Sequence, residues 1–355
     1  MSFQLSVLDQ SPISQGSTGA EALHNSLDLA GLADELGFTR YWVAEHHGTP
    51  MLACASPEAL IGPIAAATRR LRVGSGGVML PHYSPLKVAE TFSLFSGLYP
   101  ARIDLAVGRA AGTDPLTAFA LQRDRRQAAP DDFPQQLAEL LAYLRDGLPP
   151  GHRFARLTEL PGSPERPDVW LLGSSPQSSL WAAELGLPYA FADFINPGGG
   201  PIAAAYREAF IPSCGLAAPR VVVAAWVLCA DTDEEAQRLA SSARMAFALF
   251  HQGRFIRVPP VEEACRFVHE EEAAVAAGAR RRRAIVGSPE TVRAGLDDLA
   301  REYSADELMI VTITYDHAAR RRSYELIAAA CGLRTSGSAA PAPSTAATGP
   351  SAVGR

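Results

Sequence analysis

The chain has 355 residues, of which 47% are hydrophobic and 20% charged, a composition typical of a globular protein with a sizeable buried core. Its formal net charge of -6 is spread along the sequence, so it lacks the basic patch typical of nucleic-acid binding. No apolar stretch reaches the roughly 18 residues of a membrane span, and the N-terminus has no basic, signal-like region, so we expect neither membrane insertion nor secretion.

Strand-like and helix-like segments alternate along almost the whole chain. The predicted strands cover 3–8, 40–45, 71–80, 102–108, 169–172, 189–192, 221–229 and 308–314. The predicted helices cover 21–36, 57–70, 85–98, 133–144, 177–185, 232–252 and 318–331. Eight strands alternating with helices are the number that closes a (β/α)8 TIM barrel, which is the fold we predict. An open, doubly wound sheet is the alternative, although it rarely needs eight parallel strands in one domain.

Two segments are longer than a minimal barrel requires. Residues 112–167 and 251–286 are expected to form extended loops at the catalytic face, where long loops commonly act as lids or substrate walls. The last residues, 335–355, are rich in Ala, Pro, Ser, Thr and Gly and carry a single charge, so we expect a disordered tail. The predicted organisation is one barrel domain over residues 1–334, followed by this tail.

A glutamate and two histidines, Glu45-His46-His47, close the second predicted strand. Barrel enzymes keep their chemistry at the carboxyl ends of the strands, and imidazole is a common acid, base or hydrogen-bond donor there. A histidine in this position is also often a purely structural group. Because neighbouring strand residues point to opposite faces, the three side chains cannot easily bind one metal ion. The five scattered cysteines form no C-x-x-C pair, and we expect neither a metal site nor disulfides, in a reducing cytoplasm.

Two adjacent glycines, Gly76-Gly77, interrupt the apolar third strand. Glycine inside a strand indicates a bulge or the close approach of another group to the backbone. The apolar flanking residues favour a backbone face pressed against a planar ring. A cis peptide is compatible with this position, because unusual backbone geometry clusters at functional sites.

A phosphate site is indicated where the fifth strand runs into a helix, at Gly173-Ser174-Ser175-Pro176. Serine at the N-cap followed by proline starts a helix whose free N–H groups, together with serine hydroxyls, can bind an anion. The alternative is a plain capped helix. Arg109, at the end of the fourth strand, is placed either to grip a phosphate or to pair with a surface carboxylate.

Taken together, these motifs resemble the luciferase-like flavin monooxygenase family over about residues 1–334. The motifs that carry the resemblance are Leu8-Asp9-Gln10-Ser11-Pro12, Glu45-His46-His47, and the segments 73–81, 102–109, 172–175 and 181–188. The chain also resembles the subgroup that includes tailoring enzymes of bacterial aromatic polyketide antibiotic biosynthesis, such as the mensacarcin pathway.

The resemblance implies a barrel, usually a homodimer, that binds reduced FMN supplied as a cosubstrate by a separate flavin reductase. His46 matches the catalytic base. Gly76 and Gly77 match a non-prolyl cis peptide that bulges against the isoalloxazine ring. Glu90 matches an acidic position near the flavin. The implied contacts of the flavin phosphate are Arg109, Ser174, Ser175 and Ser178.

The chain also departs from the pattern of bacterial luciferase. Gly108 stands where luciferase has a reactive cysteine, and Ser174 replaces a glutamate of its phosphate loop. A second phosphate arginine has no clear equivalent, and Arg123 is the nearest candidate. Relatives often have His or Asn at the position of Asp193. The resemblance to luciferase therefore does not identify the substrate of this chain.

The function we expect is FMN-dependent monooxygenation of a small, mostly apolar organic substrate, such as a polyketide-type natural product. His46 is expected to take or donate a proton during oxygen transfer. A first alternative keeps the fold but uses the deazaflavin F420 for hydride transfer, since both cofactors carry a ribityl phosphate. A second is a non-catalytic flavin-binding protein. The complete set of eight repeats and the intact His46 argue against the second alternative.

Overall fold

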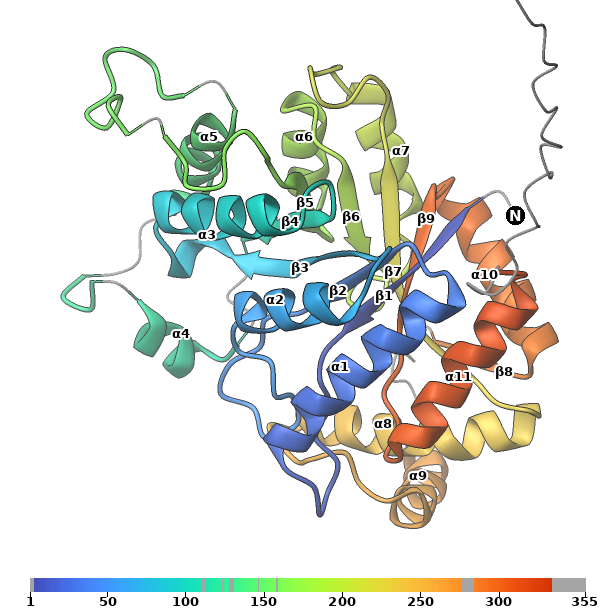
Figure 1. Ribbon diagram of the computed structural model, residues 1–355. Coiled ribbons are helices and arrows are strands. Elements are labelled where there is room, and N and C mark those ends of the chain that lie inside the picture. The colour runs from blue at the N-terminus through green and yellow to red at the C-terminus, as the bar shows by residue number, and fades with distance from the viewer. Residues whose placement is uncertain are drawn as a thin grey trace, which may run out of the picture.

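A closed parallel barrel forms the centre of the computed structural model (Figure 1), which describes residues 3–109, 113–122, 124–127, 131–145, 147–157, 159–275 and 284–333. The barrel strands are β1 Gln4–Asp9, β2 Arg40–Val43, β3 Arg72–Met79, β4 Ile103–Gly108, β5 Asp168–Gly173, β6 Tyr189–Ala192, β7 Val221–Cys229 and β9 Glu307–Val311. They pair in the order β1-β2-β3-β4-β5-β6-β7-β9, and β9 pairs with β1 to close the ring. The predicted (β/α)8 fold is confirmed.

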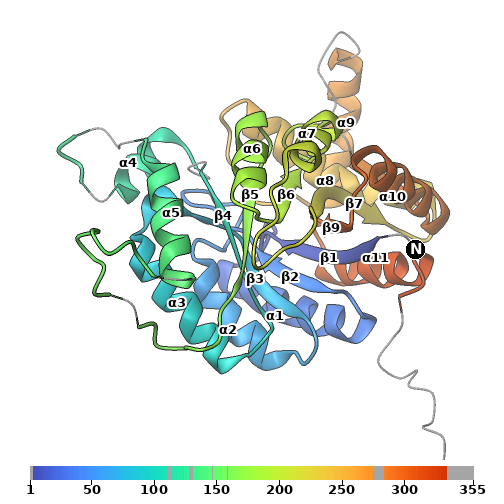
Figure 2. The same ribbon diagram turned by 90° about the horizontal axis from the view of Figure 1, so that it is seen from above.

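Helices surround the barrel on its outside, as the view from above shows (Figure 2). Those that follow strands β1 to β4 are α1 Gly19–Leu36, α2 Pro57–Ala67, the 3-10 turn η1 Leu80–His82 with α3 Pro85–Leu98, and α4 Pro115–Leu121 with α5 Phe133–Leu144. The remaining helices are α6 Pro176–Glu184, α7 Gly200–Ala209, α8 Asp233–His251, α9 Val261–Val275, α10 Pro289–Tyr303 and α11 His317–Ala330. None of the helices in the described ranges is long and apolar enough to span a membrane.

The structure adds elements that the sequence did not predict. Strand β8 Ala284–Gly287 lies outside the barrel ring and pairs with only the second half of β7, residues 226–229. Helices α4 and α9 lie within the two long segments that were expected to be loops, and α9 packs beside α8 in both views (Figures 1 and 2). The predicted tail, 335–355, lies outside the described residues.

Side chains alternate between the inside and the outside of the barrel, as the two-residue period of a strand requires. On β1, Leu5 and Val7 pack outward against the helices, whereas Leu8 joins the cluster inside the barrel. Trp42 of β2 and Trp170 of β5 belong to the same inner cluster and meet edge to face, with ring centroids 5.4 Å apart. These two tryptophans are among the largest fully buried side chains of the described residues and contribute to the packed interior of the barrel.

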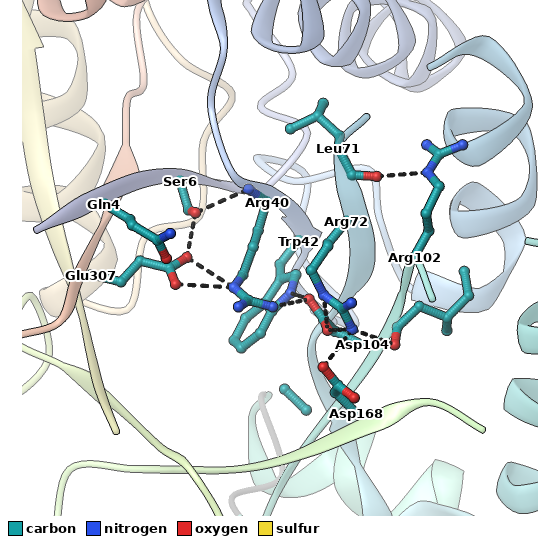
Figure 3. A network of polar contacts seen from close by, with 12 residues as sticks. Gln4, Ser6, Arg40, Trp42, Leu71, Arg72, Arg102, Asp104, Asp168 and Glu307 are labelled. Carbon is teal, nitrogen blue, oxygen red and sulfur yellow. Dashed lines mark hydrogen bonds and ion pairs between the residues drawn. The ribbon is translucent and has the colours of Figure 1, made fainter. Parts of the chain in front are cut away.

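Below the tryptophans, a buried charge network closes the amino-terminal end of the barrel (Figure 3). Asp104 accepts hydrogen bonds from Arg40 Nη1 at 2.7 Å, from Trp42 Nε1 at 3.0 Å and from Arg72 Nε at 2.9 Å. The Arg40 guanidinium also donates through Nε to the carboxylate of Glu307, at 2.9 Å. Burial alone would lower the pKa of Arg40, but Asp104 and Glu307 together raise it above its usual range, so the guanidinium is charged. Ligands therefore have to enter from the opposite end.

Candidate functional site

His46 points into the mouth of the barrel at the carboxyl end of β2. Ala44 belongs to the inner cluster, whereas the Glu45 side chain contacts Tyr83 and Met79 outside the ring. Strand β2 ends at Val43, and we infer from the opposite directions of Ala44 and Glu45 that His46 faces inward. Its backbone N–H donates a 3.0 Å hydrogen bond to the carbonyl of Cys54. The structure thus separates the three-residue motif, with one imidazole inside the barrel and the carboxylate outside.

The His46 imidazole is held in its neutral form. Its Nδ1 atom is buried and has no hydrogen-bond partner among the described residues. Burial, assisted by the neighbouring His47, lowers the pKa of His46 to about 4. A neutral imidazole has one ring nitrogen that accepts a hydrogen bond and one that donates. At neutral pH, His46 can therefore accept a hydrogen bond from a ligand in the mouth or donate one to it.

The lowered pKa of His46 predicts a specific dependence of stability on pH. Between about pH 6.5 and pH 4, the unfolded chain binds a proton at His46 that the folded chain does not, so stability falls as the pH falls through this window. In the His46→Asn variant this component disappears, at most about 1.4 kcal/mol per pH unit. Urea unfolding at pH 7.0, 5.5 and 4.5 measures it. Parallel stability curves for the two proteins would contradict the assignment.

Glu45 connects the end of β2 to the segment that follows β3. Its carboxylate lies 2.8 Å from Nε2 of His47, accepts from the hydroxyl of Tyr83 at 3.1 Å and accepts from the backbone N–H of Met79 at 2.9 Å. Burial and the adjacent Glu45 charge raise the pKa of Tyr83, which keeps its phenol protonated as a donor. These bonds fix the position of β3 relative to His46.

The Gly76-Gly77 peptide bond is cis, and β3 bulges between Gly76 and Val78. Glycine is required here by packing. A Cβ at Gly76 would lie 2.5 Å from Cδ1 of Leu8, and one at Gly77 would lie 2.7 Å from the carbonyl oxygen of Ala106 and collide with Leu172. Leu8 and Leu172 belong to the inner barrel cluster or pack on it. The bulge therefore places backbone without side chains beside the apolar interior, on the strand that pairs with β2, whose end leads to His46.

We expect the Gly77→Ala substitution to destabilise the fold and weaken flavin binding together. The added methyl group meets a backbone carbonyl that cannot rotate away, and overpacking of this kind costs about 1–3 kcal/mol. Gly31 is the matched control, because no heavy atom lies within 4 Å of a Cβ added there in helix α1. Gly31→Ala is expected to raise stability by about 0.5–1 kcal/mol. Thermal unfolding of both variants, with FMN titration, tests this pair. Equal unfolding temperatures of the Gly77→Ala and Gly31→Ala variants would refute the packing argument.

The predicted phosphate residues meet at the start of helix α6. Ser175 is the N-cap and is exposed, while Ser174 is half-buried. The Ser178 hydroxyl is buried and already engaged, donating to the Ser175 carbonyl at 2.8 Å and lying 3.0 Å from the Tyr189 hydroxyl. The Ser178 hydroxyl is therefore already used within the protein, and Ser178 contributes to an anion site mainly by its place in the first turn of α6.

Arg109 lies at the same edge of the barrel as the α6 serines. It is exposed at the end of β4, and its guanidinium carbon is 5.7 Å from the ring centroid of Trp181 in α6. The ring of Trp181 holds a cation beside the first turns of a helix whose amino terminus is free of acidic residues. Arg109 and the α6 terminus therefore place a cationic group beside the positive end of a helix, an arrangement that suits a phosphate.

Three other sequence predictions have different outcomes. Glu90 lies half-buried in helix α3, and no hydrogen bond or ion pair within the described residues connects it to the other predicted site residues. Asp193 accepts a 2.7 Å hydrogen bond from Tyr303 of α10, outside the barrel. Arg123 lies outside the described residues. In the described ranges, no group of three or more His, Cys, Asp or Glu side chains is arranged to hold a metal ion.

An aromatic wall on the mouth was not predicted. Trp226 of β7 packs against Phe194, which follows β6, with ring centroids 5.3 Å apart, and against Phe247 of α8 at 4.7 Å. The three aromatic residues are spread over more than 50 positions of the sequence. No local sequence pattern predicts that they pack together. The wall makes this side of the mouth apolar.

A (β/α)8 barrel with an inward imidazole, a glycine bulge and a cationic helix start at its strand ends defines a barrel enzyme. A model of the luciferase-like monooxygenase family matches residues 1–307, and the chain belongs to this family. It is 41% identical over 325 residues to a luciferase-like monooxygenase of Escherichia coli, covering 90% of this chain and 95% of that protein. It is 37% identical over 327 residues to an N-acetyl-S-alkylcysteine monooxygenase of Bacillus subtilis, covering 92% and 97%.

Solved structures agree with this assignment. The crystal structure of apo-MsnO8 superposes with a TM-score of 0.84 at 41% identity, covering 94% of this chain and 99% of that one. Two more distant structures share the fold alone. One is the oxygenating constituent of 3,6-diketocamphane monooxygenase of Pseudomonas putida in complex with FMN, with a TM-score of 0.70, 20% identity and coverage of 92% and 97%. The other is an F420-dependent secondary alcohol dehydrogenase, with a TM-score of 0.61, 14% identity and coverage of 93% and 99%.

Proposed function

We propose that this protein is the oxygenating component of a two-component monooxygenase. It takes reduced FMN from a separate flavin reductase and, with dioxygen, oxygenates a small, mostly apolar organic substrate, such as a polyketide-type natural product. We further propose that it acts as a homodimer in the cytoplasm. The observation that carries the proposal is the neutral imidazole of His46, half-buried with its Nδ1 atom inside, beside the glycine bulge at Gly76 and Gly77.

The residues of the mouth fit a flavin. The bulge carries no side chain that would keep a flat ring from the backbone at the half-buried Gly76, and the α6 start with Arg109 suits the ribityl phosphate. When bound, reduced FMN supplies the two electrons with which dioxygen gives one oxygen atom to the substrate and one to water. The protein binds and orients the flavin, excludes water with its apolar walls, and holds or moves a proton at His46 Nδ1.

F420 remains the alternative cofactor, because a distant neighbour of the same fold uses it. The phosphate site does not distinguish the two cofactors, since both carry a ribityl phosphate. The family of this chain and its relatives named as monooxygenases favour reduced FMN. Anaerobic titration with reduced FMN and reduced F420 decides between them. We expect binding of reduced FMN at micromolar concentrations, and selective binding of F420 would overturn the FMN assignment.

The same titration tests the proposed role of Arg109. Removal of its guanidinium in Arg109→Ala should weaken FMN binding by about tenfold or more, because a hydrogen bond to a charged group contributes about 1.5–3 kcal/mol. Riboflavin, which lacks the phosphate, should bind both proteins equally. Arg126 is the control, since it is exposed and pairs with Asp124. An equal loss of riboflavin binding in Arg109→Ala would place Arg109 away from the phosphate.

A further inference from the structure

A second polar side chain, Gln10, faces the mouth beside His46. Its neighbours both point outward, since Asp9 bonds to Tyr41 and Arg320, and the Ser11 hydroxyl lies 2.8 Å from that of Ser26 in α1. Between two outward residues, Gln10 continues the inward direction of Leu8. Gln10 is 5% exposed, and its Oε1 atom has no hydrogen-bond partner among the described residues.

Gln10 and His46 occupy the same corner of the mouth. Strand β1 pairs with β2 in the register Asp9 to Val43, which places Gln10 opposite Ala44 and one inward step from His46. From strand spacings, the two Cα atoms are about 8 Å apart, within reach of a single small group held between their side chains. Each side chain thus carries a buried atom without a partner in the described structure, Gln10 Oε1 and His46 Nδ1. Buried polar groups are normally bonded, so this pair indicates a missing ligand group.

Hydrogen bonds join three segments around this corner. The segment after β1 is held by hydrogen bonds from Ile13 N to Met51 O at 2.7 Å and from Ala53 N to Ser11 O at 2.9 Å. Val258 N donates to Ile13 O at 2.9 Å and adds a third segment. Met51, Leu52 and Val258 all belong to the apolar inner cluster. A hydrogen bond made in such an apolar enclosure discriminates strongly, because an unmade one leaves a buried polar group unpaired.

The position of Gln10 points to the substrate and away from the flavin. The features that fit the flavin run from the β3 bulge to β4 and the start of α6, all on one side of β2. Gln10 directly follows β1, on the other side of β2 from those features. The surrounding inner residues, such as Leu8, Ala44 and Ile313, carry no charge that could pair with an ionic ligand.

We propose that Gln10 is a substrate-binding residue, whose carboxamide, together with His46 Nδ1, receives a carbonyl or hydroxyl group of an uncharged, apolar substrate. This inference rests on the proposed function, because it assigns the organic substrate of the same site. It predicts that the mouth distinguishes molecules of equal shape by one oxygen-bearing group. A hydroxyl group satisfies Gln10 Oε1 by donating to it, whereas a carbonyl group is bound after the carboxamide turns to present its NH2 donors.

The test uses acetophenone, 1-phenylethanol and ethylbenzene, which share one apolar skeleton. Calorimetric titration of the full-length, FMN-loaded protein gives the affinity ratio of each oxygenated probe to ethylbenzene. In Gln10→Leu and in Gln10→Met we expect both ratios to fall about tenfold, with the affinity for FMN unchanged. Gln136→Leu is the matched control, because Gln136 is also 5% exposed with unpartnered amide atoms, but lies on helix α5 outside the barrel.

Unchanged ratios in both Gln10 variants would overturn the proposal, as would a wild-type protein that binds none of the three probes. Loss of FMN affinity together with the ratios would reassign Gln10 to the flavin site and also overturn it. The ratios do not depend on turnover. If the protein binds FMN but never oxygenates a substrate, the proposed function fails while the Gln10 assignment is still decided.

Discussion

In the His46→Ala variant, we expect oxygenated product to fall by about 10²- to 10⁴-fold while hydrogen peroxide release per reduced FMN increases. His46 is the inward imidazole of the mouth, and its neutral ring provides the group that can hold or move a proton during oxygen transfer. Without it, the electrons of reduced FMN are still consumed by dioxygen but no longer reach the substrate. Peroxide assays with parallel FMN titration measure both effects.

Two controls make the His46 result interpretable. FMN affinity should be retained in His46→Ala, because the bulge and the α6 start are untouched. His24→Ala should behave as wild type, since His24 is exposed on helix α1. Unchanged coupling in His46→Ala would remove His46 from the catalytic role, whereas loss of FMN affinity would make it a binding residue.

The Asp104→Ala substitution should cost about 3–5 kcal/mol of unfolding free energy, the largest stability effect we expect. Asp104 is fully buried and is bonded to Arg40, Trp42 and Arg72 in the floor of the barrel (Figure 3). Its removal leaves the buried Arg40 with Glu307 as its remaining ion-pair partner among the described residues. Urea unfolding measures the change directly.

Asp168 offers a matched comparison, because it pairs with the same Arg72 side chain at 2.6 Å but is 61% exposed. An exposed pair contributes about 0–1 kcal/mol, so Asp168→Ala should be nearly neutral. If Asp104→Ala and Asp168→Ala lower the free energy of unfolding equally, burial does not determine how much an ion pair of Arg72 stabilises the protein.

Much of the fold was predictable because its signals are local. Most barrel strands are largely apolar runs bounded by polar, glycine or proline residues, and all eight predicted strands became strands of the ring. Strand β8 escaped prediction because it has only four residues, partly exposed, and exists by pairing with half of β7. Strand β8 is stabilised by its pairing with β7, a tertiary contact that no local sequence pattern predicts.

The site was predictable in part for the same reason. The direction of His46 follows from the alternation of its own strand, and the need for glycine at Gly76 and Gly77 agrees with an interrupted apolar run. The partners of Glu45 were not predictable, since Met79 and Tyr83 are brought to it from 34 and 38 residues away. Gln10 likewise becomes informative only when its two outward neighbours are seen.

The central claim is that the barrel mouth directs the reaction of reduced FMN with dioxygen. The most direct measurement binds anaerobically reduced FMN to the protein, mixes it rapidly with oxygenated buffer and records spectra from milliseconds to seconds. We predict a transient absorbance, blue-shifted from oxidised FMN, whose lifetime is extended by the protein. Direct return to oxidised FMN, at the rate seen without protein, would contradict the account and make F420 the first cofactor to test.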